Sequence, residues 1–212
     1  MKTIHRYYLA AALCLMGCAA CTDATDVPGA DDGTLAGDKP VFWPEKAGSY
    51  KLAACYPLPG EYNITDQSTP EKLRQADFLV IDAVTLGYTG STPVGLQFRH
   101  ALAKVRVELT GVSAGSGEIK VEIWNSYTIL LLHESVSHYT NYAYITACRD
   151  TGNPATVAFE AMVPATSFTK QDFLRITIGD REYRFTPDDA SPTDFKPGRI
   201  YTYRVDIPSS NP

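Results

Sequence analysis

The sequence lacks any cluster of basic residues. Its 19 Lys and Arg are outnumbered by 24 Asp and Glu, which gives a formal net charge of -5 at pH 7. Binding to a phosphate backbone requires a concentrated positive surface. The charge balance therefore excludes nucleic acid as an expected partner.

Cysteine is scarce in the body of the chain. Of the 5 Cys, only Cys55 and Cys148 lie beyond the first 21 residues, and they are far apart. An isolated Cys is more often a small buried apolar residue than half of a bridge, which requires close Cα atoms. We expect two buried free thiols, with a disulfide as the alternative.

A membrane-spanning segment is also lacking. The apolar run Tyr7–Gly17 has about 11 residues, whereas a spanning helix needs about 20. It follows Lys2 and Arg6, and this order of charge and apolar run is typical of a secretory signal peptide. We assign the signal peptide to residues 1–17.

The end of the signal peptide resembles a bacterial lipobox. In the string LMGC at residues 15–18, Cys18 would become the first mature residue and carry lipid, and Cys21 is the alternative. Several acyl chains would anchor the protein firmly, since each buried CH₂ contributes about 0.8 kcal/mol. We expect outer-membrane lipid as a partner, with the protein at the cell surface or facing the periplasm.

Residues 18–38 form the expected tether. They are mostly Ala, Thr, Asp, Gly and Pro, and so cannot bury enough surface to offset their ordering entropy. About 20 flexible residues span about 25 Å, which would hold the body clear of lipid headgroups.

The remaining composition is typical of an all-β protein. The chain has 13 Tyr, 15 Gly and 14 Pro, which favour strands separated by turns. The stretch Val94–Thr110 alternates apolar and polar residues, and the alternation changes parity near residues 101–103. This change predicts a bulge or a crossing between sheets. A helix over His100–Leu109 is the alternative, which the β-branched Val105 and Val107 disfavour.

Three local signals outside this stretch are strong. Thr69-Pro70 predicts the start of a short helix that ends near Gln75. Gly179-Asp180 predicts a hairpin that places Leu174 opposite Phe185, with Arg175 opposite Arg184 on the other face. Like charges repel, so that face needs a carboxylate nearby or an exposed edge. The last strand should turn four residues inward: Tyr201, Tyr203, Val205 and Ile207.

Three possible chemical motifs have more ordinary explanations. The string GVSAG at residues 111–115 matches a nucleophile elbow around Ser113, but a strand pattern follows it where the elbow needs a helix. His133 and His138 are one residue too far apart for a helical zinc motif. His100 lies at an inward position, so we expect a neutral, hydrogen-bonded structural His. We expect no catalytic residue, metal or cofactor, and we expect that the protein is not an enzyme.

Four ordered strings resemble the fimbrillin family, in particular the Mfa-like lipoproteins of anaerobic Gram-negative bacteria. They are YKLAACYPLP (Tyr50–Pro59), ADFLVIDA (Ala76–Ala83), FRHALAKVRVEL (Phe98–Leu109) and FKPGRIYTYRVDI (Phe195–Ile207). The resemblance implies two transthyretin-like β-sandwich halves, which we place at residues 39–110 and 111–208. Members of this family usually carry a longer first half than the roughly 55 residues that separate the tether from the central string here. The first half is therefore expected to be incomplete.

The same resemblance implies a structural subunit, anchor or tip component of pili, with a role in adhesion or biofilm. Subunits of this family join by strand addition. The expected edge is the last strand, through Ile200, Tyr201, Tyr203, Val205 and Ile207, with other subunits or a second copy as partner. Some family members are matured by an arginine-specific protease, but no Arg lies between Arg6 and Arg74, so that route is not expected. A surface glycan-binding lipoprotein, which would need a platform of exposed aromatics, is the alternative.

Overall fold

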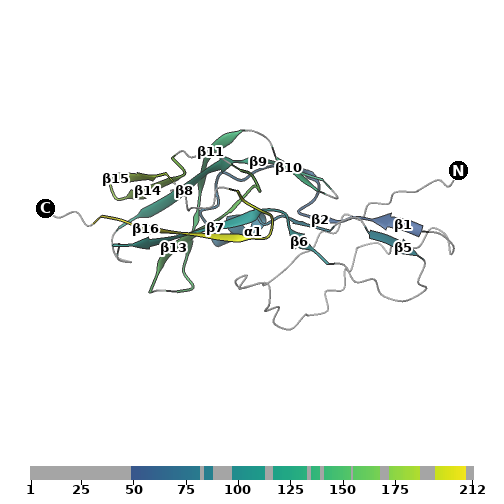
Figure 1. Cartoon of the computed structure of the whole chain (residues 1–212), viewed down its shortest axis with the longest axis horizontal. Helices are drawn as coiled ribbons and strands as arrows, with labels where there is room; N and C mark the ends of the chain where they lie inside the picture. The colour runs from purple at the N-terminus through teal and green to yellow at the C-terminus, as the bar shows by residue number, and fades with distance from the viewer. Residues whose placement is uncertain are drawn as a thin grey trace.

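The described part of the chain is almost entirely β-structure. A computed structural model describes residues 49–81, 84–87, 97–112, 117–132, 135–138, 141–153, 155–167, 172–186 and 194–208. These residues form strands β1 to β16 and one short helix, α1 (Pro70–Gln75) (Figure 1). The predicted all-β class is confirmed.

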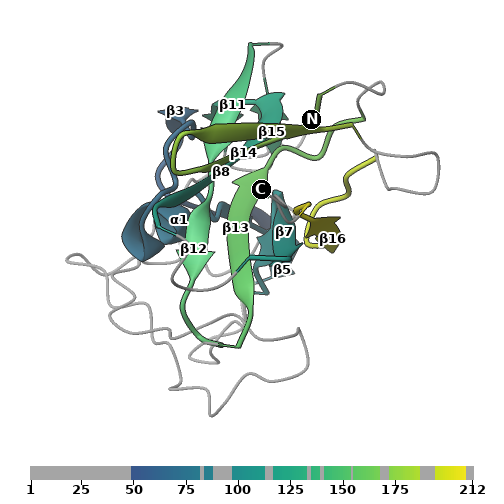
Figure 2. The same cartoon turned by 90° about the vertical axis from the view of Figure 1, so that its left-hand side faces the viewer.

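Two four-stranded sheets make up most of the fold (Figure 2). The first sheet has the spatial order β12 (Cys148–Asp150), β13 (Val157–Val163), β7 (Ala103–Thr110) and β16 (Ile200–Asp206). The second has the order β11 (Tyr142–Thr146), β8 (Ile119–Ser126), β14 (Leu174–Ile178) and β15 (Arg181–Phe185). All neighbours are antiparallel except β16, which runs parallel to β7.

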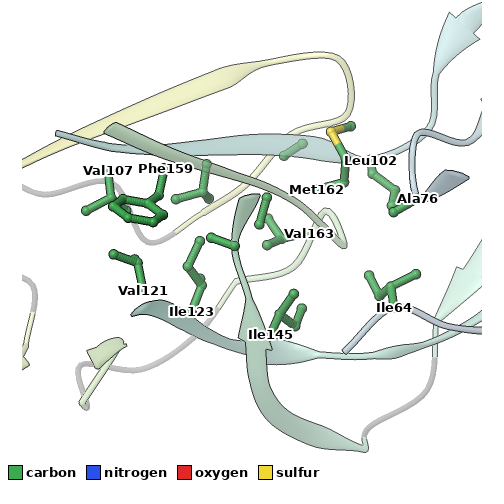
Figure 3. Close-up of a cluster of buried hydrophobic side chains, with 14 of the residues drawn as sticks. Ile64, Ala76, Leu102, Val107, Val121, Ile123, Ile145, Phe159, Met162 and Val163 are labelled. Atoms are coloured by element: carbon green, nitrogen blue, oxygen red, sulfur yellow. The ribbon is translucent and has the colours of Figure 1, made fainter. Parts of the chain in front are cut away.

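The core lies between these two sheets. Alternate residues of β7 are buried, and Val107 faces the same side as Phe159 on β13. Figure 3 shows these two side chains pointing toward Val121 and Ile123 of the second sheet. Burial of such apolar side chains on both inner faces stabilises the pairing of the sheets.

Three smaller sheets complete the described structure. They are β10 (Val136–His138) with β9 (Thr128–Leu131) and β3 (Gly60–Asn63); β2 (Cys55–Tyr56) with β4 (Leu79–Val80) and β6 (Arg99–His100); and β1 (Ser49–Leu52) with β5 (Val84–Gly87). In Figure 1 the pair β1 and β5 lies at the opposite end of the molecule from β14 and β15.

The central stretch crosses between sheets where its alternation changes parity. Arg99 and His100 belong to β6, the buried Ala101 and Leu102 follow, and β7 then begins in a different sheet. The predicted crossing is confirmed, and the helix alternative is wrong. Phe98 is only partly buried, and residues 94–96 lie outside the described residues.

Strand pairing runs across the expected boundary near residue 110. β7 pairs with β13 and β16, and β3 pairs with β9, so residues on both sides of the boundary share sheets. The division into halves at residues 39–110 and 111–208 stays a prediction, as does the likeness of each half to transthyretin.

The predicted hairpin and helix are confirmed. Leu174 lies opposite Phe185, and Arg175 lies opposite Arg184. Gly179 has a φ of 57°, which suits a glycine in this tight turn. α1 begins after Thr69, whose side chain accepts a hydrogen bond from the Lys72 amide.

Cys55 and Cys148 are buried and free, as expected, and burial raises the pKa of both thiols.

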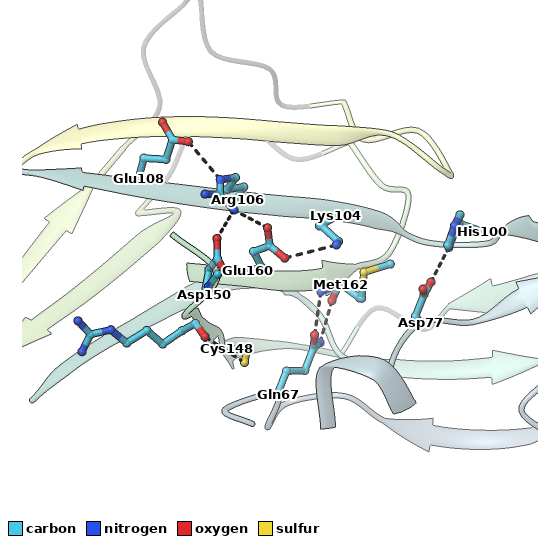
Figure 4. Close-up of polar contacts among 12 residues, drawn as sticks. Gln67, Asp77, His100, Lys104, Arg106, Glu108, Cys148, Asp150, Glu160 and Met162 are labelled. Carbon is cyan, nitrogen blue, oxygen red and sulfur yellow. Dashed lines mark hydrogen bonds and ion pairs between the residues drawn. The ribbon is translucent and has the colours of Figure 1, made fainter. Parts of the chain in front are cut away.

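The Gln67 side chain, which is fully buried, extends the first sheet beyond the end of β12 (Figure 4). Its Oε1 accepts from the Met162 amide at 2.7 Å, and its Nε2 donates to the Met162 carbonyl at 2.8 Å. One side-chain amide thus replaces a strand neighbour for β13.

Candidate interaction surfaces

The last strand, β16, forms one edge of the first sheet. No described strand pairs with the side of β16 that faces away from β7. The Lys104 amide donates to the Arg199 carbonyl at 2.9 Å, and the Ile207 amide donates to the Thr110 carbonyl at 3.0 Å. In a parallel ladder of this register, the odd-numbered residues of β16 bond to β7. The backbone groups of Thr202 and Arg204 therefore point to the open side.

The side chains of β16 attach this strand to its own sheet. Tyr203, Val205 and Ile207 are buried, while Ile200 is 51% exposed. The Tyr203 ring packs 5.0 Å from Phe173, centroid to centroid, and burial raises the pKa of its hydroxyl. The predicted inward parity of this strand is confirmed.

Gly111 allows the end of β16 to lie close to β7. Its φ is 74°, and a Cβ at this position would lie 2.4 Å from the Ile207 carbonyl oxygen. A side chain cannot be accommodated there without moving the backbone. This glycine, which follows β7 directly, holds the two strand ends together.

The outer face of the first sheet carries a charge network centred on Arg106 (Figure 4). Its Nη1 donates to Asp150 and to Glu160, each at 2.7 Å, and its Nε donates to Glu108 at 3.1 Å. Arg204 of β16 also donates to Glu108, at 3.2 Å. Hydrogen bonds from Arg106 and then Arg204 lower the pKa of Glu108. The network links all four strands of the sheet through side chains.

The outer face of the second sheet carries aromatic rings. Trp124 on β8 and Tyr142 on β11 are nearly parallel, with an interplanar angle of 21° and ring centroids 6.2 Å apart. Trp124 also meets the Tyr144 ring edge-on at 5.1 Å. Tyr142 is 39% exposed, and Trp124 and Tyr144 are partly exposed. These three residues are called the aromatic face below.

Arg175 fixes the position of Tyr144. Its guanidinium carbon lies 4.1 Å from the centre of the Tyr144 ring, and it makes two 2.8 Å hydrogen bonds to Glu122. Burial alone would raise the pKa of Glu122, but hydrogen bonds from Arg175 and Lys120 outweigh it and lower this pKa. This carboxylate is the counter-charge predicted for the face on which Arg175 meets Arg184.

Comparison with known proteins identifies the family. A model of the fimbrillin-like family matches residues 19–211. The chain belongs to the fimbrillin-like family. This match covers the whole of the described structure and the four strings that suggested the same family.

Solved structures support the fold of this fimbrillin-like chain. A candidate cell adhesion protein from Bacteroides uniformis is 18% identical, with a TM-score of 0.65 over 84% of this chain and 75% of that one. Another from Bacteroides ovatus is 18% identical, with a TM-score of 0.52 over 76% of this chain and 63% of that one. No curated protein matches the chain.

The predicted lipid-attachment residue Cys18 and its alternative Cys21 lie outside the described residues. So do Ser113 and His133, at which no site was expected. A strand, β8, follows residues 111–117 where a nucleophile elbow would need a helix. Within the described residues, no group of three or more His, Cys, Asp or Glu could hold a metal ion, and no helix could cross a membrane.

The prediction for His100 is partly wrong. Its Nδ1 lies 2.7 Å from Asp77 Oδ1, and its side chain is 43% exposed rather than enclosed. The hydrogen bond to Asp77 raises the pKa of His100, so the imidazole is biased toward its charged form. A carboxylate partner 23 residues away in the sequence could not be predicted from the alternation alone.

The aromatic face of the fimbrillin-like chain was missed by sequence reasoning. The two tyrosines that the sequence places on a strand face, Tyr201 and Tyr203, belong to the core side of β16. The alternation of β8 nevertheless places Trp124 on the outward face with Lys120 and Glu122. Only the register between β8 and β11 brings Trp124 opposite Tyr144.

Proposed function

We propose that this fimbrillin-like chain is a lipid-anchored subunit of the cell surface that joins a pilus by strand addition at β16. A strand from another subunit, or from a second copy, would bond to the outward backbone groups of Thr202 and Arg204. Main-chain hydrogen bonds supply affinity in this mode of recognition. The absence of any Arg between Arg6 and Arg74 favours an anchoring or terminal subunit over one released by an arginine-specific protease.

The open side of β16 is the observation that carries the proposal. β16 has seven residues, whereas β15, the corresponding edge of the second sheet, has five. The inward side chains of β16 are held in the core, and Gly111 keeps its end against β7. A strand attached this firmly is suited to accept a neighbour rather than to leave its own sheet.

The test is to block the open side without disturbing the pairing with β7. Thr202→Pro removes an outward N–H, which an edge strand tolerates. Glu182→Pro, on β15, is the matched control because it makes the same change on the edge of the other sheet. Filaments extracted from a deletion strain that carries each variant are examined by electron microscopy and probed for this protein.

We expect the wild type and Glu182→Pro to copurify with filaments, and Thr202→Pro to be lost from them. Both variants should keep the wild-type unfolding temperature. Copurification of Thr202→Pro at the wild-type level would contradict strand addition at this edge.

Lipid attachment is proposed at Cys18, with Cys21 as the alternative. We expect Cys18→Ala to abolish incorporation of labelled palmitate and to move the protein out of the outer-membrane fraction. Cys21→Ala is the matched control and should keep both properties. The reverse pattern would transfer the anchor to Cys21.

A further inference from the structure

The aromatic face has the features of a binding platform for a flat, uncharged ligand. The rings of Trp124 and Tyr142, on neighbouring strands, stack against each other, and Tyr142 is among the few large hydrophobic side chains exposed in the described residues. Exposed aromatic clusters on soluble proteins mark contact sites more often than single exposed residues do.

The rings are held in place by the residues beneath and beside them. Tyr144 stacks under Arg175, and its hydroxyl donates to the Asp172 carbonyl at 3.2 Å. The Tyr144 ring in turn packs against Trp124 at an interplanar angle of 64°. Because Arg175 is itself held by two hydrogen bonds to the buried Glu122, the platform is pre-organised.

The charges around the platform are paired with one another. Arg175 and Lys120 both bond to the Glu122 carboxylate. Arg184 pairs with two further carboxylates: its Nε lies 2.8 Å from Glu182 Oε1, and its Nη1 lies 3.7 Å from Asp172 Oδ2. Three cations thus face three carboxylates. A charged ligand would find no net opposite charge, whereas exposed polar groups such as Lys120, Arg184 and Glu182 can hydrogen-bond to hydroxyls at the rim.

We propose that the aromatic face binds a neutral polysaccharide, with the exposed Tyr142 ring, backed by Trp124, stacking on the C–H face of a pyranose ring. The C–H groups of a sugar face are apolar and weakly positive, which suits the negative face of an aromatic ring. The hydroxyls at the edge of the sugar then meet the paired charged groups at the rim. This function is separate from strand addition at β16, which lies on the other sheet.

The chain is well suited to a direct test because it has only 2 Trp, Trp43 and Trp124. In a Trp43→Phe background, fluorescence reports on Trp124 alone. The full-length chain is titrated with xylan, mannan and mixed-linkage β-glucan, and with polygalacturonate as the acidic comparison. Retardation in native gels that contain each polysaccharide gives a second measure of affinity.

We expect at least one neutral polysaccharide to retard the protein and to shift Trp124 emission. Tyr142→Ala should weaken binding by about tenfold or more, since exposed aromatic anchors dominate such contacts, while leaving the unfolding temperature unchanged. Tyr142→Phe keeps the ring and should bind as the wild type does. Ile200→Ala and Thr202→Pro, both on β16, should also bind normally.

Three results would overturn the proposal. They are the absence of retardation by all three neutral polysaccharides, wild-type affinity in Tyr142→Ala, and equal or tighter binding of polygalacturonate. Loss of filament incorporation in Thr202→Pro with intact polysaccharide binding would separate this site from the proposed pilus edge.

Discussion

The two four-stranded sheets share one core but have different outer faces. On the first sheet, Arg106 sits among Glu108, Asp150 and Glu160, so that the charges of the face satisfy one another. On the second sheet, Arg175 likewise bonds to a carboxylate, that of Glu122, but it also packs against the Tyr144 ring. Among the described residues, both sheets end in an edge strand, the longer β16 on the first and β15 on the second. The outer face of the first sheet carries paired charges, whereas that of the second carries exposed aromatic rings.

This contrast shows that alternation sets which residues point outward, while strand register sets which side chains of the neighbouring strands lie beside them. Both β7 and β8 alternate apolar and polar residues. β13, and β12 beyond it, supply carboxylates to Arg106 of β7, whereas the neighbour β11 supplies tyrosines to β8. The same sequence rule thus yields two surfaces of different chemistry, one charged and one aromatic.

The largest expected effect on stability comes from Gln67, whose side chain takes the place of a strand neighbour beside β13. Gln67→Ala removes both hydrogen bonds to the Met162 backbone and leaves these buried groups unpaired, which should lower the free energy of unfolding by about 2 to 4 kcal/mol. Urea denaturation measures this change. Gln75→Ala, on the exposed face of α1, is the control and should change stability by less than about 0.5 kcal/mol. Equal effects of the two variants would show that Gln67 does not act as a strand substitute.

A smaller effect is expected when the charge network of the first sheet is broken. Arg106→Met leaves three partly buried carboxylates without their shared cation and should lower the free energy of unfolding by about 1 to 3 kcal/mol at pH 7. Arg204→Met is the matched control because Arg204, 80% exposed, also bonds to Glu108. Its loss should cost less than about 1 kcal/mol.

The pH dependence of Arg106→Met follows from its partners. A backbone hydrogen bond from Gly152 and then Arg106 lower the pKa of Asp150, and Arg106 lowers that of Glu108. Groups with a lowered folded-state pKa stabilise the protein above their unfolded values, near 3.8 and 4.5, and lose this contribution as the pH falls through the folded values. The difference between wild type and Arg106→Met should therefore shrink toward pH 3. A constant difference from pH 7 to pH 3 would contradict this account.

The smallest effect concerns His100, which responds to pH in the opposite direction. The hydrogen bond to Asp77 raises the pKa of His100, so its contribution is complete below the unfolded value of 6.5 and is lost as the pH rises through the folded value. Because the side chain is 43% exposed, His100→Asn should cost only about 0.5 kcal/mol at pH 5.5 and less at pH 9. Urea denaturation at both values measures it. A larger cost at pH 9 would show that the imidazole acts through packing instead of charge.

Sequence reasoning succeeded where the physical cause is local. The hairpin at Gly179-Asp180 follows from turn chemistry, and the start of α1 follows from capping by Thr69. Alternation is less informative before residue 60: every second residue from Tyr50 to Tyr56 is apolar, yet β1 and β2 in this stretch belong to different sheets. Alternation continues through such a break, because parity carries no information about which strand lies alongside.

The sequence by itself determined the all-β class, the inward faces of β7 and β16, and the family. Only the tertiary structure decided that β16 lies parallel to β7, that Gln67 pairs with Met162 95 residues away, and that Trp124 meets Tyr142. Side-chain parity and turn chemistry depend on neighbours in the sequence. Partner choice between distant strands depends on how all the apolar faces are buried together, which no single stretch of sequence specifies.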